Sequence, residues 1–188
     1  MPQWMLWNLM LAAIPVALAC VLFRRRAQRN VAWWALLVMW VLFLPNAPYV
    51  LTDVVHMIDS MQNTSTRIQG YALLLVYASF FAAGLACYVV ALQLCRRYMH
   101  SVAPQWVVAP ALLVLHGACV VAMYLGRVVR LNSWDVVVAP GAVLRSVLVV
   151  PRPFTIALLI AMFFVTGFAA YATKVVGDQV LAAARRLL

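Results

Sequence analysis

Apolar runs long enough to cross a membrane take up most of this chain. They cover residues of about 4–23, 31–51, 70–94, 106–125 and 154–172. A helix needs about 20 apolar residues to cross the hydrocarbon core of a bilayer. The chain is 68% hydrophobic and 10% charged, whereas soluble domains are only about half apolar. The sequence therefore predicts an all-α, polytopic integral membrane protein, with residues 1–188 forming one helical domain with five transmembrane helices.

Two segments depart from a simple span. The second run contains Pro45 and Pro48, so it crosses only if the helix bends or breaks there. Irregular backbone at that depth must be buried in protein or face water. Residues 136–150 are apolar but short, and they contain Pro140 and Arg145. We predict that this segment is interfacial or re-entrant, and a sixth span is the alternative.

The basic residues predict the orientation of the bundle. With the amino terminus outside, nine of the 14 face the cytoplasm: Arg24, Arg25, Arg26, Arg29, Arg96, Arg97, Lys174, Arg185 and Arg186. The other five face outward: Arg67, Arg127, Arg130, Arg145 and Arg152. Because cytoplasmic loops are enriched in Lys and Arg, we predict an outside amino terminus. The net charge of +10 then reflects topology, and we expect no nucleic-acid partner.

A first polar cluster follows the second run. Tyr49, Thr52, Asp53 and His56 recur at helical spacing and would share one face of a helix. A carboxylate one turn before an imidazole can orient the ring and raise its basicity, so Asp53 and His56 are candidates for an acid/base pair. They are also candidate metal ligands, with Asp135 as the third. Alternatively, they only hydrogen-bond neighbouring loops at the membrane interface.

A second polar cluster follows the fourth run. Arg127 and Arg130 lie one turn apart, close to Asn132. Two guanidinium groups at this spacing can hold a phosphate or carboxylate, so these residues, with Tyr49, are candidates for binding an anionic ligand. The alternative is an internal ion pair with Asp53 or Asp135, because a charge near the membrane normally needs a protein partner.

His116 lies near the middle of the fourth run. An ionisable group at that depth is a candidate proton relay, which would suit a transporter whose second span is broken. The other interpretation is a neutral histidine hydrogen-bonded to a neighbouring helix.

Several motifs together resemble a known family of bacterial membrane proteins, the domain of unknown function 1361. They are Trp7-Asn8-Leu9, Pro45-Asn46-Ala47-Pro48-Tyr49 with Thr52-Asp53 and His56, and Gly126-Arg127 with Arg130 and Asn132-Ser133-Trp134-Asp135. The resemblance implies a bacterial integral membrane protein of several spans. It implies no activity, because the family has none assigned.

Three classes of function follow from these observations. The leading hypothesis is a protein of the bacterial cytoplasmic membrane with an outer-face pocket that binds an anionic lipid or envelope precursor. The alternatives are a small transporter and a non-catalytic assembly subunit in which Asp53 and Arg127 lock two helices together. The chain has no phosphate-binding glycine loop, H-E-x-x-H or G-x-S-x-G motif, so the sequence leaves open whether it is an enzyme and identifies no cofactor. A homo-oligomer is also left open.

Overall fold

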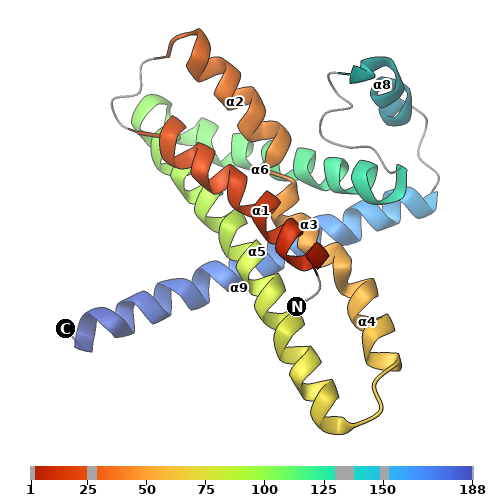
Figure 1. Ribbon diagram of the computed structural model, residues 1–188. Helices are drawn as coiled ribbons and strands as arrows, with labels where there is room; N and C mark the ends of the chain where they lie inside the picture. The colour runs from red at the N-terminus through yellow and green to blue at the C-terminus, as the bar shows by residue number, and fades with distance from the viewer. Residues whose placement is uncertain (1–2, 25–28, 130–137, 149–152, 188) are drawn as a thin grey trace.

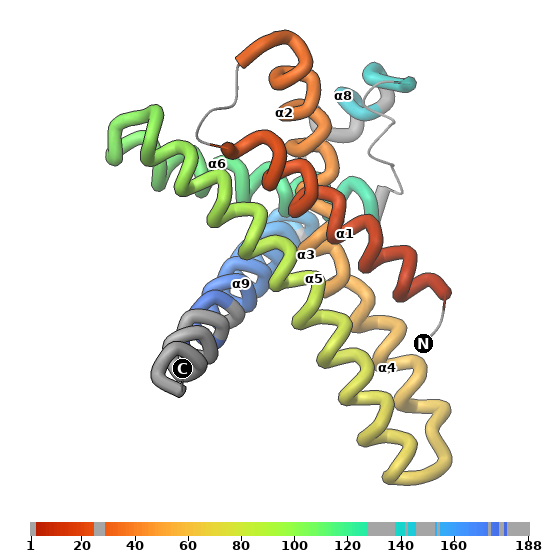
Figure 2. The backbone as a smooth tube through the Cα atoms, turned by 60° about the vertical axis from the view of Figure 1, so that its left-hand side comes forward, coloured from red at the N-terminus to blue at the C-terminus, as the bar shows by residue number. Residues whose placement is uncertain are grey.

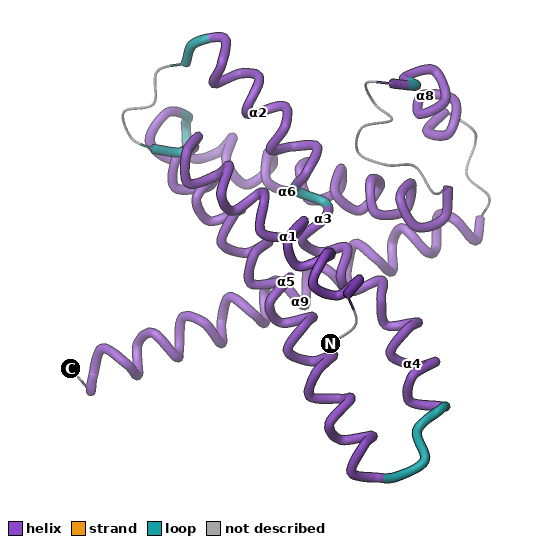
Figure 3. The backbone as a smooth tube through the Cα atoms, viewed as in Figure 1, coloured by secondary structure: helices purple, strands orange, loops and turns teal. Residues whose placement is uncertain are grey.

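The computed structural model describes residues 3–24, 29–129, 138–148 and 153–187. Helices are the only regular elements in these ranges (Figures 1 and 3). They are α1 (Gln3–Leu22), α2 (Val31–Phe43), α3 (Asn46–Tyr49), the 3₁₀ turn η1 (Val50–Asp53), α4 (Val54–Gln62), α5 (Arg67–Val102), α6 (Gln105–Tyr124), the π-helical turn η2 (Leu125–Val129), α8 (Pro140–Leu148) and α9 (Pro153–Leu187).

Five helical stretches are long and apolar enough to cross a membrane, which confirms the predicted number. They are Gln3–Leu22, Val31–Gln62, Arg67–Val102, Gln105–Arg127 and Thr155–Val176. The helices run further than the apolar runs, because α4 extends the second stretch to Gln62 and α9 continues to Leu187. Polar residues at these ends are compatible with helix but do not count toward a hydrophobic span.

The prolines break the second stretch as predicted. Pro45 and Pro48 have no N–H to donate to the preceding turn, and α2 ends at Phe43. The chain then continues through α3 and η1 into α4, so the path stays helical while its hydrogen-bonding pattern changes. The change from α to 3₁₀ geometry decides which way the side chains of η1 point.

Helix α8 is too short to be a sixth span. It has nine residues, or roughly 14 Å at 1.5 Å per residue, against a hydrocarbon core of about 30 Å. Its described part therefore agrees with a five-span bundle, whereas its interfacial or re-entrant position stays a prediction.

The helices surround a core that lies mainly between α1, α2 and α5 (Figures 1 and 2). Trp40 and Tyr88 are its largest buried side chains. A second apolar cluster joins Met5, Val50 and Phe80 near the start of α1. Gly84 of α5 lies where α3 and η1 cross it, since a Cβ there would be 3.0 Å from the carbonyl oxygen of Ala47 and would overlap Val50. This close approach positions η1 against the core.

The turn between α1 and α2 is held by side chains that satisfy helix ends. Asn30 is the N-cap of α2, and its side-chain oxygen accepts from the Trp33 N–H at 2.9 Å. The Trp33 indole donates to the carbonyl of Leu22, in the last turn of α1, at 3.0 Å. These bonds use groups that helix ends leave without intrahelical partners.

We expect Asn30→Ala to lower the free energy of unfolding by about 1 kcal/mol, because alanine cannot accept from the α2 N-terminus. Asn30→Asp keeps an acceptor, so its free energy of unfolding should be close to that of the wild type. The midpoint of unfolding in dodecyl maltoside micelles titrated with sodium dodecyl sulfate measures both. Equal losses in the two variants would contradict a capping role.

Candidate functional site

Asp53 occupies the last position of η1 and is 1% exposed. Residues three apart in a 3₁₀ turn lie on the same side, so Asp53 follows Val50, which packs on Gly84. Both side chains are buried. The 3₁₀ geometry and the close approach at Gly84 together turn the carboxylate toward the interior of the bundle.

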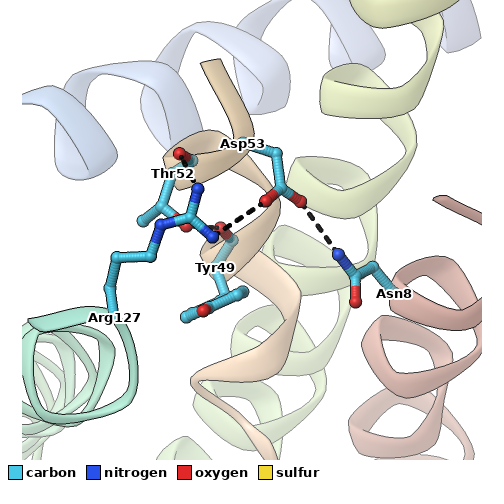
Figure 4. Close-up of polar contacts among 5 residues, drawn as sticks. All are labelled: Asn8, Tyr49, Thr52, Asp53 and Arg127. Carbon is cyan, nitrogen blue, oxygen red and sulfur yellow. Dashed lines mark hydrogen bonds and ion pairs between the residues drawn. The ribbon is translucent and has the colours of Figure 1, made fainter. Parts of the chain in front are cut away.

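The Asp53 carboxylate accepts hydrogen bonds from two other spans (Figure 4). Asn8 of α1 donates through Nδ2 to Oδ2 at 2.9 Å, and Arg127 donates to Oδ1 at 3.3 Å. The contact with Arg127 is also an ion pair. Three spans therefore meet at one buried carboxylate.

Arg127 reaches Asp53 from η2, the π-helical turn that follows α6. Its other terminal nitrogen donates to the Thr52 carbonyl at 3.0 Å. The guanidinium carbon lies 5.8 Å from the centre of the Tyr49 ring, within the range of a cation–π contact. π turns in α-helices are often found at functional sites, and this one holds an arginine whose side chain is 30% exposed.

The ion pair between Asp53 and Arg127 is the internal pairing that the sequence left as one alternative. An isolated carboxylate buried this deeply would cost several kcal/mol. Arg127 offsets that cost with its charge, and Asn8 adds a further donor. The Arg127 side chain is still partly exposed, so its exposed part can contact a ligand.

His56 makes no hydrogen bond with this carboxylate among the described contacts, although it lies close enough for an electrostatic interaction. It is exposed at the start of α4, and its ring centre is 5.1 Å from that of Trp4. Both oxygens of Asp53 accept from other residues, so the predicted orientation of His56 by Asp53 has no hydrogen bond among those described. The acid/base role of this pair stays a prediction.

The predicted metal site is only partly within the described residues. Among these residues, no group of three or more His, Cys, Asp or Glu side chains could hold a metal ion. Asp135, the expected third ligand, lies outside the described residues, as do Arg130 and Asn132. Metal binding by Asp53 and His56 therefore stays a prediction, as does the joint anion site of Arg127 and Arg130.

A cavity of about 370 Å³ lies beside the Asp53–Arg127 pair. We call it the α1–α6 cavity. Its lining consists of Trp7, Asn8, Leu11, Val41, Leu42, Phe43, Pro45, Asn46, Tyr49, Leu115, Ala118, Cys119, Ala122, Leu125, Gly126 and Val143. Most of this wall is apolar, and the polar residues come from the motifs that the sequence singled out.

Two polar groups on this wall are unpartnered. In the described part of the chain, neither the Asn46 amide nor the Tyr49 hydroxyl has a hydrogen-bond partner, and both residues are half-buried. Their polar atoms are accessible, since among the described residues Trp40 Nε1 is the buried side-chain polar atom that has no partner. These two can therefore serve a molecule bound in the cavity.

Asn8 is the site residue that the sequence analysis did not single out as a candidate. It is the only residue with a polar amide between Trp4 and Phe23, and a polar residue inside a span is a recognised functional signal. The Thr52 carbonyl could not be found in this way, because any residue carries one.

His116 makes hydrogen bonds with both ring nitrogens. Nε2 lies 3.1 Å from the Phe163 carbonyl, and Nδ1 lies 2.8 Å from the Tyr88 hydroxyl. A carbonyl only accepts, so Nε2 donates to Phe163, while the Tyr88 hydroxyl can donate to or accept from Nδ1. His116 therefore joins α5, α6 and α9 through its hydrogen bonds, whereas its neutral charge and its role as a proton relay stay predictions.

Comparison with known proteins gives a family and no activity. Residues 7–168 match the family described as Protein of unknown function (DUF1361). Comparison with curated proteins and with solved structures found no match to either. The matched range contains Asn8, Tyr49, Asp53 and Arg127. The chain has five helices long and apolar enough to cross a membrane, and it belongs to the DUF1361 family.

Proposed function

We propose that this protein binds an amphiphile with an anionic head group in the α1–α6 cavity. The membrane is the cytoplasmic membrane of a bacterium, and the ligand is a phospholipid or a lipid-linked envelope precursor. The observation that carries the proposal is a pair of groups without hydrogen-bond partners among the described residues, Asn46 and Tyr49, on the wall of a mainly apolar cavity beside Arg127. Small-molecule sites commonly combine apolar walls with a few polar groups that fix orientation.

The shape of the cavity suits a molecule with a polar head and an apolar tail. Its polar residues are grouped near Gly126, whereas Leu115 and Cys119 line it deeper in α6. From Leu115 to Gly126 a helix rises roughly 16 Å, about half of a 30 Å hydrocarbon core. The tail of an amphiphile would therefore end near the middle of the bilayer.

The charge at the polar end suits an anion. Tyr49, which lines the cavity, contacts the Arg127 guanidinium, and the Arg127 side chain is 30% exposed whereas Asp53 is 1% exposed. The guanidinium is therefore the more accessible of the two charges. Asp53 and the Thr52 carbonyl hold the guanidinium in a fixed position. A positioned donor loses less entropy on binding than a free side chain. The Tyr49 hydroxyl and the Asn46 amide supply further donors.

A cavity-filling variant tests the proposal. The wild-type chain is reconstituted in vesicles with a phosphatidylglycerol or a polyprenyl phosphate that carries a diazirine in its chain. After irradiation, cross-links are expected in residues 41–49 and 115–126. Ala118→Phe fills the cavity and should reduce those cross-links at least about tenfold, since loss of a fitted apolar site costs more than 1.4 kcal/mol.

Ala161→Phe is the matched control, because Ala161 is exposed on α9 and does not line the cavity. Tyr49→Phe should lower the yield about fivefold, the effect of one lost hydrogen bond of about 1 kcal/mol. The two probes distinguish a phospholipid from an envelope precursor. If Ala118→Phe and Ala161→Phe give equal yields, the cavity binds no amphiphile, and the Asp53–Arg127 pair has a structural role like that of an assembly subunit.

A further inference from the structure

A second hollow lies between α6 and α9, and its lining shares no residue with the α1–α6 cavity. We call it the α6–α9 groove. It has a volume of about 830 Å³. Several of its apolar lining residues, among them Leu113, Phe164 and Phe168, are more than half exposed. An open apolar groove at membrane depth is in contact with lipid.

The groove is formed because two antiparallel helices separate. Tyr124 faces Thr155 at one end of the pair, with 3.5 Å between the hydroxyl oxygens, and His116 meets Phe163 further along. Beyond that contact α6 and α9 diverge, as Figures 1 and 2 both show. The end of the groove near the middle of α6 is lined by His116, Phe163 and Gly167. The end near the start of α6 is lined by Arg96, His100 and Gln105.

The length of the groove matches half a bilayer. From Gln105 to His116 the helix rises roughly 16 Å, and one leaflet contributes about half of a 30 Å core. The walls between these residues include Val108, Leu112 and Phe168. They offer an apolar surface along the full depth that one acyl chain occupies.

The end of the groove at Gln105 is basic. Arg96 lies near the end of α5, is exposed, and donates through Nε to His100 at 3.4 Å. The described residues that line the groove include no acidic side chain. An arginine guanidinium binds phosphate well because it presents several donors in one plane. The charge therefore complements an anionic lipid head group.

We propose that the α6–α9 groove is a binding site for one acyl chain of an anionic phospholipid, with the phosphate of its head group at Arg96 and His100. This lipid belongs to the leaflet at the end of the bundle where α5 ends and α6 begins. The site is separate from the α1–α6 cavity, so each of the two proposals can fail without the other.

The test uses the full chain in phosphatidylcholine vesicles that contain a small fraction of phosphatidylglycerol with a diazirine in one acyl chain. We expect cross-links in residues 105–113 and 163–171, which the α1–α6 cavity does not use. Arg96→Gln should lower their yield about fivefold, the effect of one basic residue at an anionic surface. A diazirine phosphatidylcholine should give the wild type a similarly low yield.

Arg97→Gln is the matched control. Arg97 is also exposed and adjacent in sequence, but it does not line the groove, so its loss should leave the yield unchanged. Ala109→Trp should abolish the cross-links by filling the groove while leaving all charges in place. Size-exclusion chromatography of each variant checks that it is folded.

Two results would overturn the proposal. If Arg97→Gln lowers the yield as much as Arg96→Gln, the lipid is attracted by the surface charge alone and not by a site. If the wild type gives no cross-links to the lipid in residues 105–113 and 163–171, the groove holds no acyl chain.

Discussion

Arg127→Met is expected to lower the free energy of unfolding by about 3–5 kcal/mol, the usual cost of removing one partner of a buried ion pair. The Asp53 carboxylate would remain 1% exposed with Asn8 as its one described donor. Methionine preserves much of the apolar stem and removes the charge. The measurement is unfolding in dodecyl maltoside micelles by sodium dodecyl sulfate, followed by tryptophan fluorescence.

Substitution of the other partner, Asp53→Asn, should lower the free energy of unfolding by less than Arg127→Met does. In Asp53→Asn the amide can still pair with Asn8, and Arg127, already 30% exposed, can turn toward water. The double variant Asp53→Asn/Arg127→Met should recover more than half of the loss, because no charge is then buried without a partner. Additive losses in the double variant would contradict a direct interaction between the two residues.

Arg67→Met is the control for loss of an exposed arginine that makes no ion pair in the described residues. Arg67 is exposed at the first position of α5, and a surface substitution of this kind usually changes stability by less than about 0.5 kcal/mol. If Arg127→Met lowered the free energy of unfolding as little as Arg67→Met, the burial of Asp53 would not depend on the ion pair.

Gly84→Ala is the second substitution with a large expected effect. It should lower the free energy of unfolding by about 3 kcal/mol, at the upper end of the usual cost of overpacking. The new Cβ would overlap Val50 and lie 3.0 Å from the Ala47 carbonyl. Val50 is β-branched and has few rotamers in a helix, and a backbone oxygen cannot move alone. The α3–η1 segment must therefore shift away from α5, which also moves Asp53.

The same α5 helix offers a matched control. Gly70 has no atom within 4 Å of a Cβ added there, so Gly70→Ala should stabilise the helix by about 0.5–1 kcal/mol. Val50→Ala combined with Gly84→Ala should be more stable than Gly84→Ala alone, since it removes the overlapping methyl groups. Failure of this rescue would mean that the Val50 contact does not limit the approach of the two helices.

These two predictions bear on the proposed function through one residue. Asp53 holds Arg127 beside the α1–α6 cavity, and Gly84 lets η1 bring Asp53 to that place. We therefore expect Gly84→Ala to reduce cross-linking in the cavity but not in the α6–α9 groove. The groove is formed by the last turns of α5, the opposite end of α6, and α9, and none of its lining residues belongs to α3 or η1.

The sequence by itself determined which segments cross the membrane. Five apolar runs gave the number of spans, because crossing a hydrocarbon core of fixed thickness requires a minimum apolar length. Pro45 and Pro48 gave the break in the second span, because a residue without an N–H cannot continue the hydrogen-bond ladder. Both properties are local, so neither depends on how the helices are packed.

Only the tertiary structure decided which polar residues meet. Arg127 pairs with Asp53 across 74 positions, and Asn8 completes the group from a third span. The sequence named Asp53 as one of two acidic partners for Arg127, but it could not choose between Asp53 and Asp135. It contained Asn8 in a family motif without indicating that Asn8 contacts Asp53. The physical reason is that lipid and protein core are both apolar, so a spanning helix has no hydrophobic stripe that reveals which face meets a neighbour. The rotation of each helix, the close contact at Gly84 and the separation of α6 from α9 come from packing between distant segments.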